Sequence, residues 1–550
     1  MSSKAGVTMI LTFTALGSGL IPAAGSPAGS RRQAVSLIPL PVSVEYSDGF
    51  FLITPSTRVI AENEAAVEAS KLVDVLAPAM GFRLDRIGSP QSPEQTIKLE
   101  LDKSLSQLGA EGYGLEVSAG RILIRAQKSA GLFYGIQTLL QLLAPQIFSE
   151  TTVNDVPWEV PCVRIVDYPR FQWRGLLVDP ARHFIPTEDL LRFIDNMALH
   201  KFNSLQIHLT DDQGWRIEIK KYPKLTQVGA RRSETLIGHM SQKPWRFDGK
   251  PHGGYYSQDD IRRLVRYASD RHIRIVPEIE MPGHARAAIS AYPNLGVFPE
   301  KQRDLKPWTH WGVSEDIFAP RAGTIEFLQD VLSEVMDLFP GTYIHVGGDE
   351  AIKNQWKASE EMQALIRENG LENEEQLQAW FIKQMDTFLT EHGRKLVGWD
   401  EILEGGLAPG ATVMSWRGEK GGIAAANAGH DVVMAPTSHT YFDYYQGPAE
   451  KEPLAIGGNL PLEQVYQYDP VPKAIAPEKA GHVLGVQGQL WTEYISTPSH
   501  LEYMAYPRAA ALAEVGWSEA GAKDYEKFLS RLRRHLERLE VRGVNYRKLD

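Results

Sequence analysis

Two adjacent carboxylates, Asp349 and Glu350, follow a glycine pair in the stretch 343–351, YIHVGGDEA. Consecutive side chains of an extended strand point to opposite faces, so both carboxylates can serve one site only if the strand ends before them. Gly347 and Gly348 permit such a turn, because glycine adopts backbone conformations that other residues avoid. Neighbouring carboxyl groups oppose each other's ionisation, which favours one protonated group near neutral pH. This pattern is typical of a general acid acting on an ether-like leaving oxygen, and an ordinary polar loop is the alternative.

The closeness of Asp349 and Glu350 argues against a mechanism in which one is the acid and the other the nucleophile. Standard glycosidases hold their acid and its partner about 5–5.5 or 6.5–9.5 Å apart across the sugar. Sequence neighbours have Cα atoms only about 3.8 Å apart, so we expect both carboxylates on the same side of the bond. Asp349 is therefore a poor candidate for attack on an anomeric carbon, and the nucleophile can belong to the substrate itself.

Eight short apolar runs, separated by helical segments, are the elements available to position this pair. The runs are 175–179, 204–208, 273–277, 342–346, 395–399, 412–416, 431–435 and 483–487. Short continuous apolar runs are typical of strands buried on both faces, as in parallel sheets. With a capping pattern at Ser257 and Asp260 and an apolar helical stripe over 325–339, they predict an α/β fold, a (β/α)8 TIM barrel. An open doubly wound sheet is the alternative, although no glycine-rich nucleotide loop follows the first run.

The chain divides into segments around this barrel. Residues 36–157 predict a small α+β domain, the barrel is expected over 160–520, and residues 521–550 are expected to form a C-terminal helix packed on the barrel. The elements expected in the small domain are strands at 114–117 and 121–125 and helices at 65–80 and 130–143.

Residues 1–26 predict a signal peptide, because Lys4 precedes an apolar stretch to about Ile21 and small residues follow it. A membrane anchor is the alternative, but Thr, Gly and Ser interrupt the stretch, which is shorter than the ~20 residues of a span. We expect an exported protein, periplasmic or extracellular, without a membrane span after signal cleavage. The single cysteine, Cys162, cannot form an intramolecular disulfide and is expected to fill core space, which suits a bacterial periplasm or medium. A net charge of −10 without a basic block argues against a nucleic-acid partner.

Polar and aromatic residues follow most of the expected strands. In a barrel, catalytic groups lie at the carboxyl ends of the strands. The segments found there are 179–183, 208–212, 278–284, 347–350, 399–401, 416–417 and 491–493. One such end would mean little, but their repetition predicts a site at that rim.

Four of these segments carry a resemblance to a known family. They are RGLLVDPARHF at 174–184, HLTDDQGW at 208–215, PEIEMPGH at 277–284 and HVGGDE at 345–350. Their order and content resemble the family 20 glycoside hydrolases, the β-N-acetylhexosaminidases, from about residue 36 to 540. The resemblance implies a retaining mechanism in which the 2-acetamido oxygen of the substrate attacks the anomeric carbon and gives an oxazolinium intermediate.

The resemblance also implies the catalytic roles. Glu350 would protonate the leaving oxygen and later activate water. Asp349 would orient the acetamido N–H, and Tyr441 would bond the acetamido oxygen. Asp211 and His284 would support the acid/base residue.

Further residues would hold the sugar. Arg182 and Glu493 would bind the distal hydroxyls and Asp443 the 6-hydroxyl. Three tryptophans, Trp399, Trp416 and Trp491, would wall the acetamido pocket. Taken singly, each of these residues also has a structural explanation, such as a core tryptophan, a salt bridge or a helix cap.

The implied activity is the exo-hydrolysis of terminal non-reducing β-linked GlcNAc or GalNAc from oligosaccharides or glycoconjugates. We expect no cofactor and no metal, because His208 and His345 lie on different expected strands without partners at zinc spacing. The glycan that is cleaved, the preference between GlcNAc and GalNAc, and the oligomeric state are left open, and the loops 233–256 and 294–321 carry no interpretable code.

Two alternatives come from other classes. A diguanylate cyclase has a Gly-Gly-Asp/Glu-Glu-Phe turn, but Ala351 stands in place of the phenylalanine here. A non-catalytic glycan-binding protein on the same scaffold would not require the Asp349–Glu350 pair.

Overall fold

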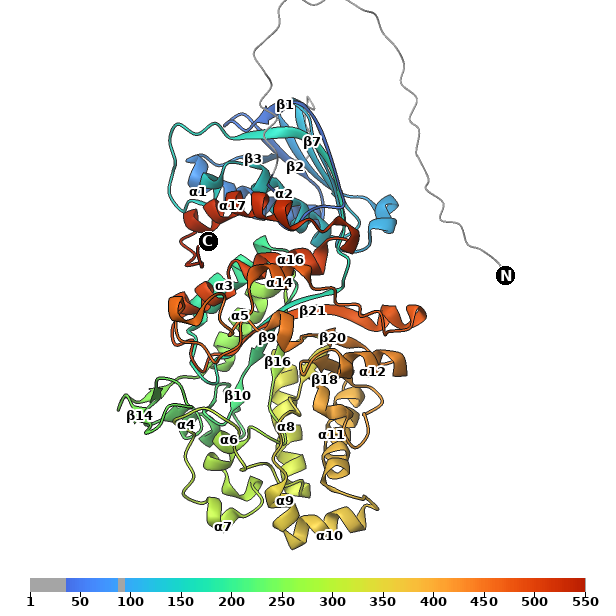
Figure 1. The fold of residues 1–550 in the computed structure, drawn as a ribbon. Helices are drawn as coiled ribbons and strands as arrows, with labels where there is room; N and C mark the ends of the chain where they lie inside the picture. Colours follow the sequence, from blue (N-terminus) through green and yellow to red (C-terminus); the bar gives the residue numbers. More distant parts are fainter. Residues whose placement is uncertain (1–35, 88–93, 550) are drawn as a thin grey trace, which may run out of the picture. The chain divides into compact units, whose positions relative to one another are not determined.

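The computed structural model describes residues 36–87 and 94–549. The expected signal peptide lies outside the described residues. Over the described part, the chain forms a small sheet domain followed by a barrel (Figure 1). None of the helices described is both long enough and apolar enough to cross a membrane.

The small domain is built on a seven-stranded sheet with the order β1-β7-β5-β6-β4-β2-β3. The strands are β1 (Ser43–Leu52), β2 (Arg58–Ala61), β3 (Asp85–Ile87), β4 (Thr96–Leu101), β5 (Tyr113–Val117), β6 (Arg121–Ala126) and β7 (Glu159–Asp167). Two helices, α1 (Ala65–Met80) and α2 (Ser129–Leu142), pack against this sheet. Both predicted helices and the predicted β5–β6 hairpin are present.

The small domain extends beyond the boundary expected at residue 157. Strand β7 pairs antiparallel with β1 and with β5, so it completes the sheet. Its buried residues include Val160, Cys162 and Ile165. The expected start of the barrel at 160 is therefore corrected: the first barrel strand begins at Trp173.

Eight parallel strands close the barrel in the order β16-β17-β18-β19-β20-β21-β8-β9. They are β8 (Trp173–Val178), β9 (Ser204–His208), β16 (Arg274–Glu278), β17 (Tyr343–His345), β18 (Lys395–Trp399), β19 (Thr412–Ser415), β20 (Val432–Met434) and β21 (Val483–Leu490). Every predicted run overlaps one of them, with bounds that differ by up to three residues. The closed ring replaces the open doubly wound alternative.

Helices follow seven of the barrel strands in the chain and lie outside the ring (Figure 1). They are α3 (Thr187–Leu199), α5 (Gln258–Ser269), α8 (Ala322–Leu338), α11 (Glu374–Glu391), α12 (Lys420–Ala428), α14 (Leu462–Gln467) and α16 (Arg508–Trp517). Strand β18 is followed instead by the 3₁₀ turn η4 (Asp400–Leu403). The predicted capping box starts α5, since Ser257 and Asp260 each bond the other's backbone N–H.

Shorter elements lie in the loops. The helices are α4 (Lys224–Gln227), α6 (Arg286–Ala291), α7 (Pro299–Gln302), α9 (Asn354–Ala358), α10 (Glu360–Glu368), α13 (Thr437–Thr440) and α15 (Pro498–Ala505). The strands are β10 (Thr210–Asp211), β11 (Gly214–Trp215), β12 (Arg231–Arg232), β13 (Leu236–Ile237), β14 (Arg246–Phe247) and β15 (His252–Gly253).

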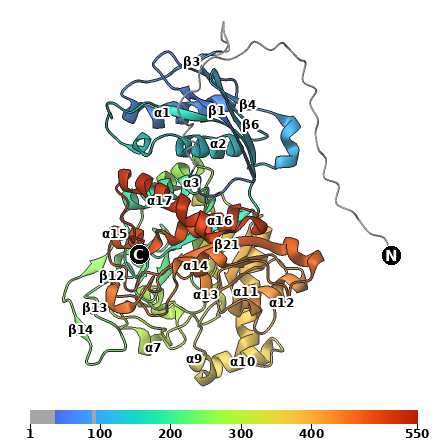
Figure 2. The same ribbon diagram turned by 45° about the horizontal axis from the view of Figure 1, so that its top comes forward.

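The last helix, α17 (Tyr525–Val541), contacts the small domain as well as the barrel (Figure 2). Arg531 Nε donates to the carbonyl of Leu37, and Arg538 Nη2 donates to the carbonyl of Gln141 in α2. On the barrel side, His535 Nε2 lies 2.8 Å from Nε2 of His200, which ends α3. The helix therefore joins the two domains, whereas packing on the barrel alone was expected.

Large side chains fill the barrel interior. Trp173, Leu177, Val397 and Met414 belong to one buried cluster that also includes Trp399. Since the interior is packed, the groups available for chemistry are those at its carboxyl-end rim.

Candidate active site

The turn after β17 depends on glycine. The backbone φ angles are 67° at Gly347, 93° at Gly348 and 45° at Glu350. A Cβ atom at Gly347 would lie 1.7 Å from Glu280 Oε2, so any side chain there would collide with this buried carboxyl group. Both the left-handed backbone and the lack of space therefore require glycine at Gly347.

Asp349 and Glu350 lie beside the same imidazole. His284 Nε2 is 3.6 Å from Asp349 Oδ2 and 3.5 Å from Glu350 Oε2. The side chain of Asp349 is 12% exposed, whereas that of Glu350 is 41% exposed. The turn thus places two carboxyl groups together, one buried and one accessible to a ligand.

The two carboxyl groups differ in pKa. Burial raises the pKa of Asp349 to about 6, although the charge of His284 opposes this shift. A hydrogen bond from His284 lowers the pKa of Glu350. The sequence indicated one protonated carboxyl group in the pair, and the structure gives the raised pKa to Asp349 because that residue is the buried one.

Asp211 contacts Nδ1 of His284, the ring nitrogen that faces away from Asp349 and Glu350. Asp211 Oδ1 lies 3.1 Å from His284 Nδ1, and its Oδ2 lies 2.8 Å from His208 Nε2. Burial disfavours the charged form of His284, but the carboxylate of Asp211 raises the pKa of His284 well above its usual value. An imidazolium therefore faces Asp349 and Glu350.

A second buried carboxylate, Glu278, contacts two histidines and a tryptophan at the carboxyl ends of the barrel strands. Its Oε2 lies 2.8 Å from His208 Nδ1, and its Oε1 lies 3.0 Å from His345 Nδ1. Trp399 Nε1 also donates to Oε1 at 2.9 Å, which fixes the indole. Sequence reasoning did not select Glu278, although a charged residue at the end of an apolar run was an available signal.

Arg182 is bound on several sides by the protein. Its Nη1 lies 3.0 Å from Asp179 Oδ2, its Nη2 lies 2.7 Å from Asp211 Oδ2, and its Nε donates to Gln213 Oε1 at 3.1 Å. The guanidinium carbon lies 5.2 Å from the ring centre of Trp491. Arg182 is thus fixed in position and only 7% exposed.

Asp443 is buried and Glu493 is partly buried, and each has one buried carboxyl oxygen without a hydrogen-bond partner among the described residues. These oxygens are Asp443 Oδ1 and Glu493 Oε2. Burial, strengthened by the charge of Glu493, raises the pKa of Asp443 well above its usual value. Burial also raises the pKa of Glu493, although Arg182 opposes it. Such unsatisfied buried atoms suit a ligand rich in hydroxyl groups.

The aromatic residues form two contacting pairs. The rings of Trp399 and Trp491 are 5.7 Å apart at 47°, and those of Trp416 and Tyr441 are stacked at 6.2 Å and 23°. Trp416 Nε1 donates to Glu401 Oε2 at 2.8 Å, which fixes the second pair. The three tryptophans expected at the rim are therefore near one another, with Tyr441 beside them.

The charge of Asp349 affects two further carboxyl groups that were not among the predicted site residues, Glu401 and Glu280. Burial, together with the charge of Asp349, raises the pKa of Glu401 to about 8. The same causes raise the pKa of Glu280 well above its usual value. Both its oxygens are buried without a hydrogen-bond partner among the described residues, although Oε1 lies 3.7 Å from His208 Nδ1. Their sequence signal was position alone, since both closely follow a barrel strand.

Three groups of side chains have metal-ligand types with donor atoms within 4.8 Å of one another. They are His208–Glu278–Glu280, Asp211–Asp212–His284 and His284–Asp349–Glu350. In each group a histidine nitrogen already pairs with a carboxylate, which suits a protonated imidazole at least as well as a cation. The expectation of no metal stays a prediction.

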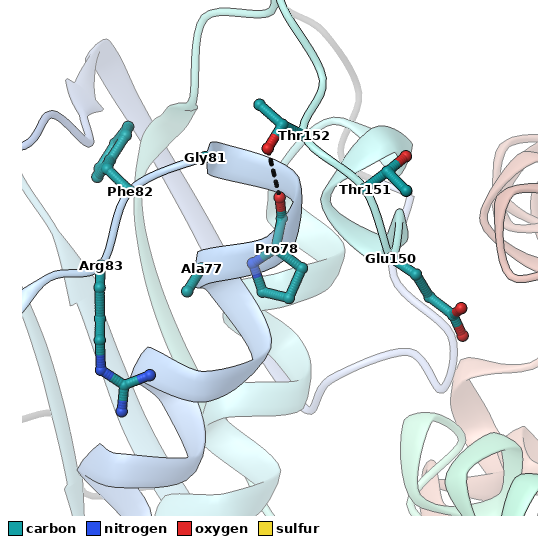
Figure 3. A pocket seen from close by; sticks show the side chains of 8 residues that line it. All are labelled: Ala77, Pro78, Gly81, Phe82, Arg83, Glu150, Thr151 and Thr152. Atoms are coloured by element: carbon teal, nitrogen blue, oxygen red, sulfur yellow. Dashed lines mark hydrogen bonds between the residues drawn. The ribbon is translucent and has the colours of Figure 1, made fainter.

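A surface depression lies elsewhere, on the small domain. Figure 3 shows the residues that line this space, where the end of α1 meets residues 150–152. Its volume is about 580 Å³. Its charged lining residues, Arg83 and Glu150, point apart. It therefore assembles no pair of groups that could act together.

Comparison with known proteins agrees with this geometry. Residues 171–520 match the catalytic domain of glycosyl hydrolase family 20, and residues 34–168 match domain 2 of the same family. A β-hexosaminidase of Porphyromonas gingivalis is 46% identical over 517 residues, which cover 94% of this chain and 64% of that protein. One of Vibrio furnissii is 35% identical and is covered to 80% of its length, with 92% of this chain aligned.

A solved structure agrees as well. The family 20 β-N-acetylhexosaminidase of Streptomyces coelicolor superimposes with a TM-score of 0.81 at 32% identity, over 94% of this chain and 98% of that one. The match extends through the rim, so the glycine-carboxylate turn is not that of a cyclase. The chain belongs to glycosyl hydrolase family 20 and is a glycoside hydrolase with the catalytic domain of the β-N-acetylhexosaminidases.

Proposed function

We propose that the protein is an exo-acting β-N-acetylhexosaminidase that removes terminal non-reducing β-linked GlcNAc or GalNAc with retention, through an oxazolinium intermediate. The observation that carries this proposal is the common contact of Asp349 and Glu350 with His284. Because the two carboxyl groups lie on one side, they are suited to act on a leaving oxygen and on a neighbouring acetamido group. Attack from the opposite face of the sugar is then left to the substrate's own acetamido oxygen.

In the first step, Glu350 donates its proton to the glycosidic oxygen. The acetamido oxygen forms a bond to the anomeric carbon as the bond to the leaving oxygen breaks, and the leaving group departs as an alcohol. Asp349, as a carboxylate, accepts a hydrogen bond from the acetamido N–H and stabilises the positive charge of the new ring. Tyr441 donates to the acetamido oxygen and orients it.

In the second step, the Glu350 carboxylate takes a proton from water as the water oxygen bonds to the anomeric carbon. The ring opens, the acetamido group is restored, and the sugar leaves with its original configuration. Glu350 ends protonated, as it began.

Protonation of Glu350 before the first step follows from substrate binding. Its side chain is 41% exposed, so a bound sugar removes water from it. Loss of water disfavours the carboxylate and raises the pKa of Glu350 against the effect of His284. Asp211 acts as a positioning residue, because it holds His284 in place.

The rest of the rim suits the sugar itself. Arg182, Asp443 and Glu493 offer donors and acceptors to the distal hydroxyls, and the unsatisfied oxygens of Asp443 and Glu493 support this role. Trp399, Trp416 and Trp491 supply apolar faces for the ring and the acetamido methyl group.

The test compares an aryl N-acetyl-β-glucosaminide with the matching aryl β-glucoside. We expect the acetamido substrate to be cleaved at least ~10³-fold faster, because only it carries the internal nucleophile. Equal rates would assign the attack to a protein carboxylate and would overturn the roles given to Asp349 and Glu350.

We also propose that the chain is exported, on the basis of the signal-peptide pattern of residues 1–26. Amino-terminal sequencing of the mature protein should find a start near residue 27. An intact Met1 on the active enzyme would contradict export by cleavage.

A further inference from the structure

The loop 233–256, called the wall loop here, joins several neighbouring loops of the rim. It follows β9 and contains the short hairpin β13–β14. Leu236 N donates to the carbonyl of Thr309, in the loop after β16. Met240 N donates to Tyr494 Oη, after β21, at 3.1 Å. His239 Nε2 lies 3.0 Å from the carbonyl of Ile456, in the loop after β20.

The wall loop is also tied to Arg182. Arg232, which directly precedes the loop, donates from Nη1 to the carbonyl of Arg182 at 2.6 Å. His252, within the loop, accepts from the backbone N–H of Phe184 at 3.1 Å. The loop thus fixes the segment after β8 that carries the guanidinium.

The barrel order places these contacts on one side. In the closed ring, β21 is the fourth strand from β17 in either direction, so Glu493 and Glu350 leave from opposite strands. The loops bonded to the wall loop follow β20, β21, β8 and β16. Among the described residues, none of its hydrogen bonds reaches the loops after β17, β18 and β19. The wall loop therefore lies on the side of Arg182 and Glu493, whereas the side chain of Glu350, on the opposite side, is 41% exposed.

A stack of side chains stiffens the loop. Lys243 Nζ lies 3.0 Å from the ring centre of Trp245, and the rings of Trp245 and His310 are 4.6 Å apart. The His310 ring lies 4.4 Å from that of Trp308, which Arg286 approaches at 5.6 Å. Such ring and cation contacts are attractive, so the stack holds the wall loop against loop 294–321.

The tip of the wall loop, residues 238–245, is anchored beside Glu493. The ring of His239 stacks on that of Tyr494 at 5.2 Å and 8°, and Trp245 Nε1 donates to the Met240 carbonyl at 2.8 Å. Tyr494 directly follows Glu493, whose buried Oε2 has no hydrogen-bond partner among the described residues. The tip is thus fixed next to the group proposed to bind the most distal hydroxyls.

We propose that the tip of the wall loop is the barrier that ends the site beyond those hydroxyls, and that it restricts cleavage to unsubstituted terminal sugars. The inference rests on the proposed hexosaminidase function and deepens it by naming the residues that set exo action. A sugar attached to a distal hydroxyl would have to occupy the space of His239, Met240 and Trp245. A glycan on the leaving-group side meets no such barrier.

The test replaces residues 238–245 by Asn-Gly. Ile237 and Arg246 are paired in the β13–β14 hairpin, and a two-residue Asn-Gly turn is the usual way to close such a pair. Two substrates are compared: an aryl β-glycoside of GlcNAc, and the aryl β-glycoside of a β-1,4-linked GlcNAc disaccharide. The products released from the disaccharide substrate are separated and quantified at early times.

We expect the unaltered protein to release GlcNAc and at most traces of disaccharide from the disaccharide substrate. The shortened variant should release at least tenfold more intact disaccharide than the unaltered protein does. A shortened variant that also carries Glu350→Gln should lose both products, which shows that one site makes them. If the shortened variant cleaves the monosaccharide substrate normally but still releases only GlcNAc, the barrier role is wrong. If the unaltered protein does not cleave the monosaccharide substrate, the proposed function itself fails.

A milder variant guards against misfolding. Tyr494→Phe removes only the hydroxyl that accepts from Met240 N and keeps the stacked ring. It should shift the products in the same direction by a smaller factor. If neither this variant nor a folded shortened variant shifts them, the inference is overturned.

Discussion

The carboxylate of Asp211 lies 3.1 Å from Nδ1 of His284 and keeps that imidazole charged. The other nitrogen of the same ring faces the two carboxyl groups of the turn after β17. The ion pair of Asp211 with His284 therefore influences the pKa of both Asp349 and Glu350. A hydrogen bond from this imidazolium lowers the pKa of Glu350, whereas at Asp349 burial outweighs the effect of its charge.

Glu350→Gln should lower kcat about 10²- to 10⁴-fold on oligosaccharides, because proton donation to a poor leaving group is lost. With an aryl leaving group of low pKa, the first step needs little acid and the loss should be smaller. Steady-state rates on both substrates check this. Equal losses on the two would mean that Glu350 is not the acid.

Asp349→Asn should impair formation of the ring intermediate even with an activated aryl leaving group, because the charge that stabilises it is gone. The same carboxylate gives a pH prediction. Its pKa of about 6 in the folded protein means that the ionised form is lost as pH falls through 6, so kcat/KM should fall below that pH. A profile that stays flat from pH 7 to pH 4.5, or an Asn variant with unchanged activity, would contradict the role of Asp349.

Glu401 is predicted to act through Trp416. Because its pKa of about 8 keeps it protonated at neutral pH, Glu401→Gln should retain the bond from Trp416 Nε1 and stay near the parent activity at pH 7. Glu401→Ala removes the acceptor, and loss of one hydrogen bond of about 1 kcal/mol should raise KM about fivefold. The split between KM and kcat for the two variants is the measurement. Equal behaviour of Gln and Ala would exclude this positioning role.

The barrel could be predicted from the sequence because its strands are short and mostly apolar, as at Leu396–Val397 and Val432–Val433. The domain boundary could not, since residues 159–167 were not selected as a strand and only the pairing of β7 with β1 and β5 assigns them to the sheet. The role of α17 likewise depends on partners distant in sequence, such as Leu37 and Gln141.

Some residues of the site could be predicted from the sequence and others could not. Motif residues such as Asp349, Glu350 and Arg182 were selected from local sequence, and the structure brings them to one rim. Glu278 and Glu401 were not predicted as site residues, because their importance depends on burial by other strands. Glu278, for example, is held by His208 and His345, which neighbour it only in the closed barrel.

Gly347→Ala should destabilise the protein and reduce activity together. The new Cβ would lie 1.7 Å from Glu280 Oε2, so the turn that carries Asp349 must move. Gly370 is the matched control, because its φ of 66° equals that of Gly347 within one degree and no heavy atom lies within 4 Å of the point that a Cβ atom would occupy there. Gly370→Ala should lower the free energy of unfolding by about 1–2 kcal/mol and leave kcat unchanged. Denaturant unfolding and rate measurements on both variants test this prediction. If the two variants lose the same stability and activity, the collision with Glu280 at Gly347 has no effect of its own.

The contact of His535 with His200, between α17 and the barrel, predicts acid sensitivity of the fold. Burial lowers the pKa of His200 to about 4, and burial with the neighbouring positive charges lowers that of His535 as well. Since the unfolded histidines take up protons near pH 6.5, stability is lost as pH falls below that value, and the loss for His200 continues to about pH 4. The shift of His200 corresponds to about 3 kcal/mol at the acid end. His200→Gln should therefore reduce the drop in Tm between pH 7 and pH 4.5, whereas His392→Gln, at an exposed site, should leave it unchanged. An identical drop in both variants would mean that this pair does not control the acid stability.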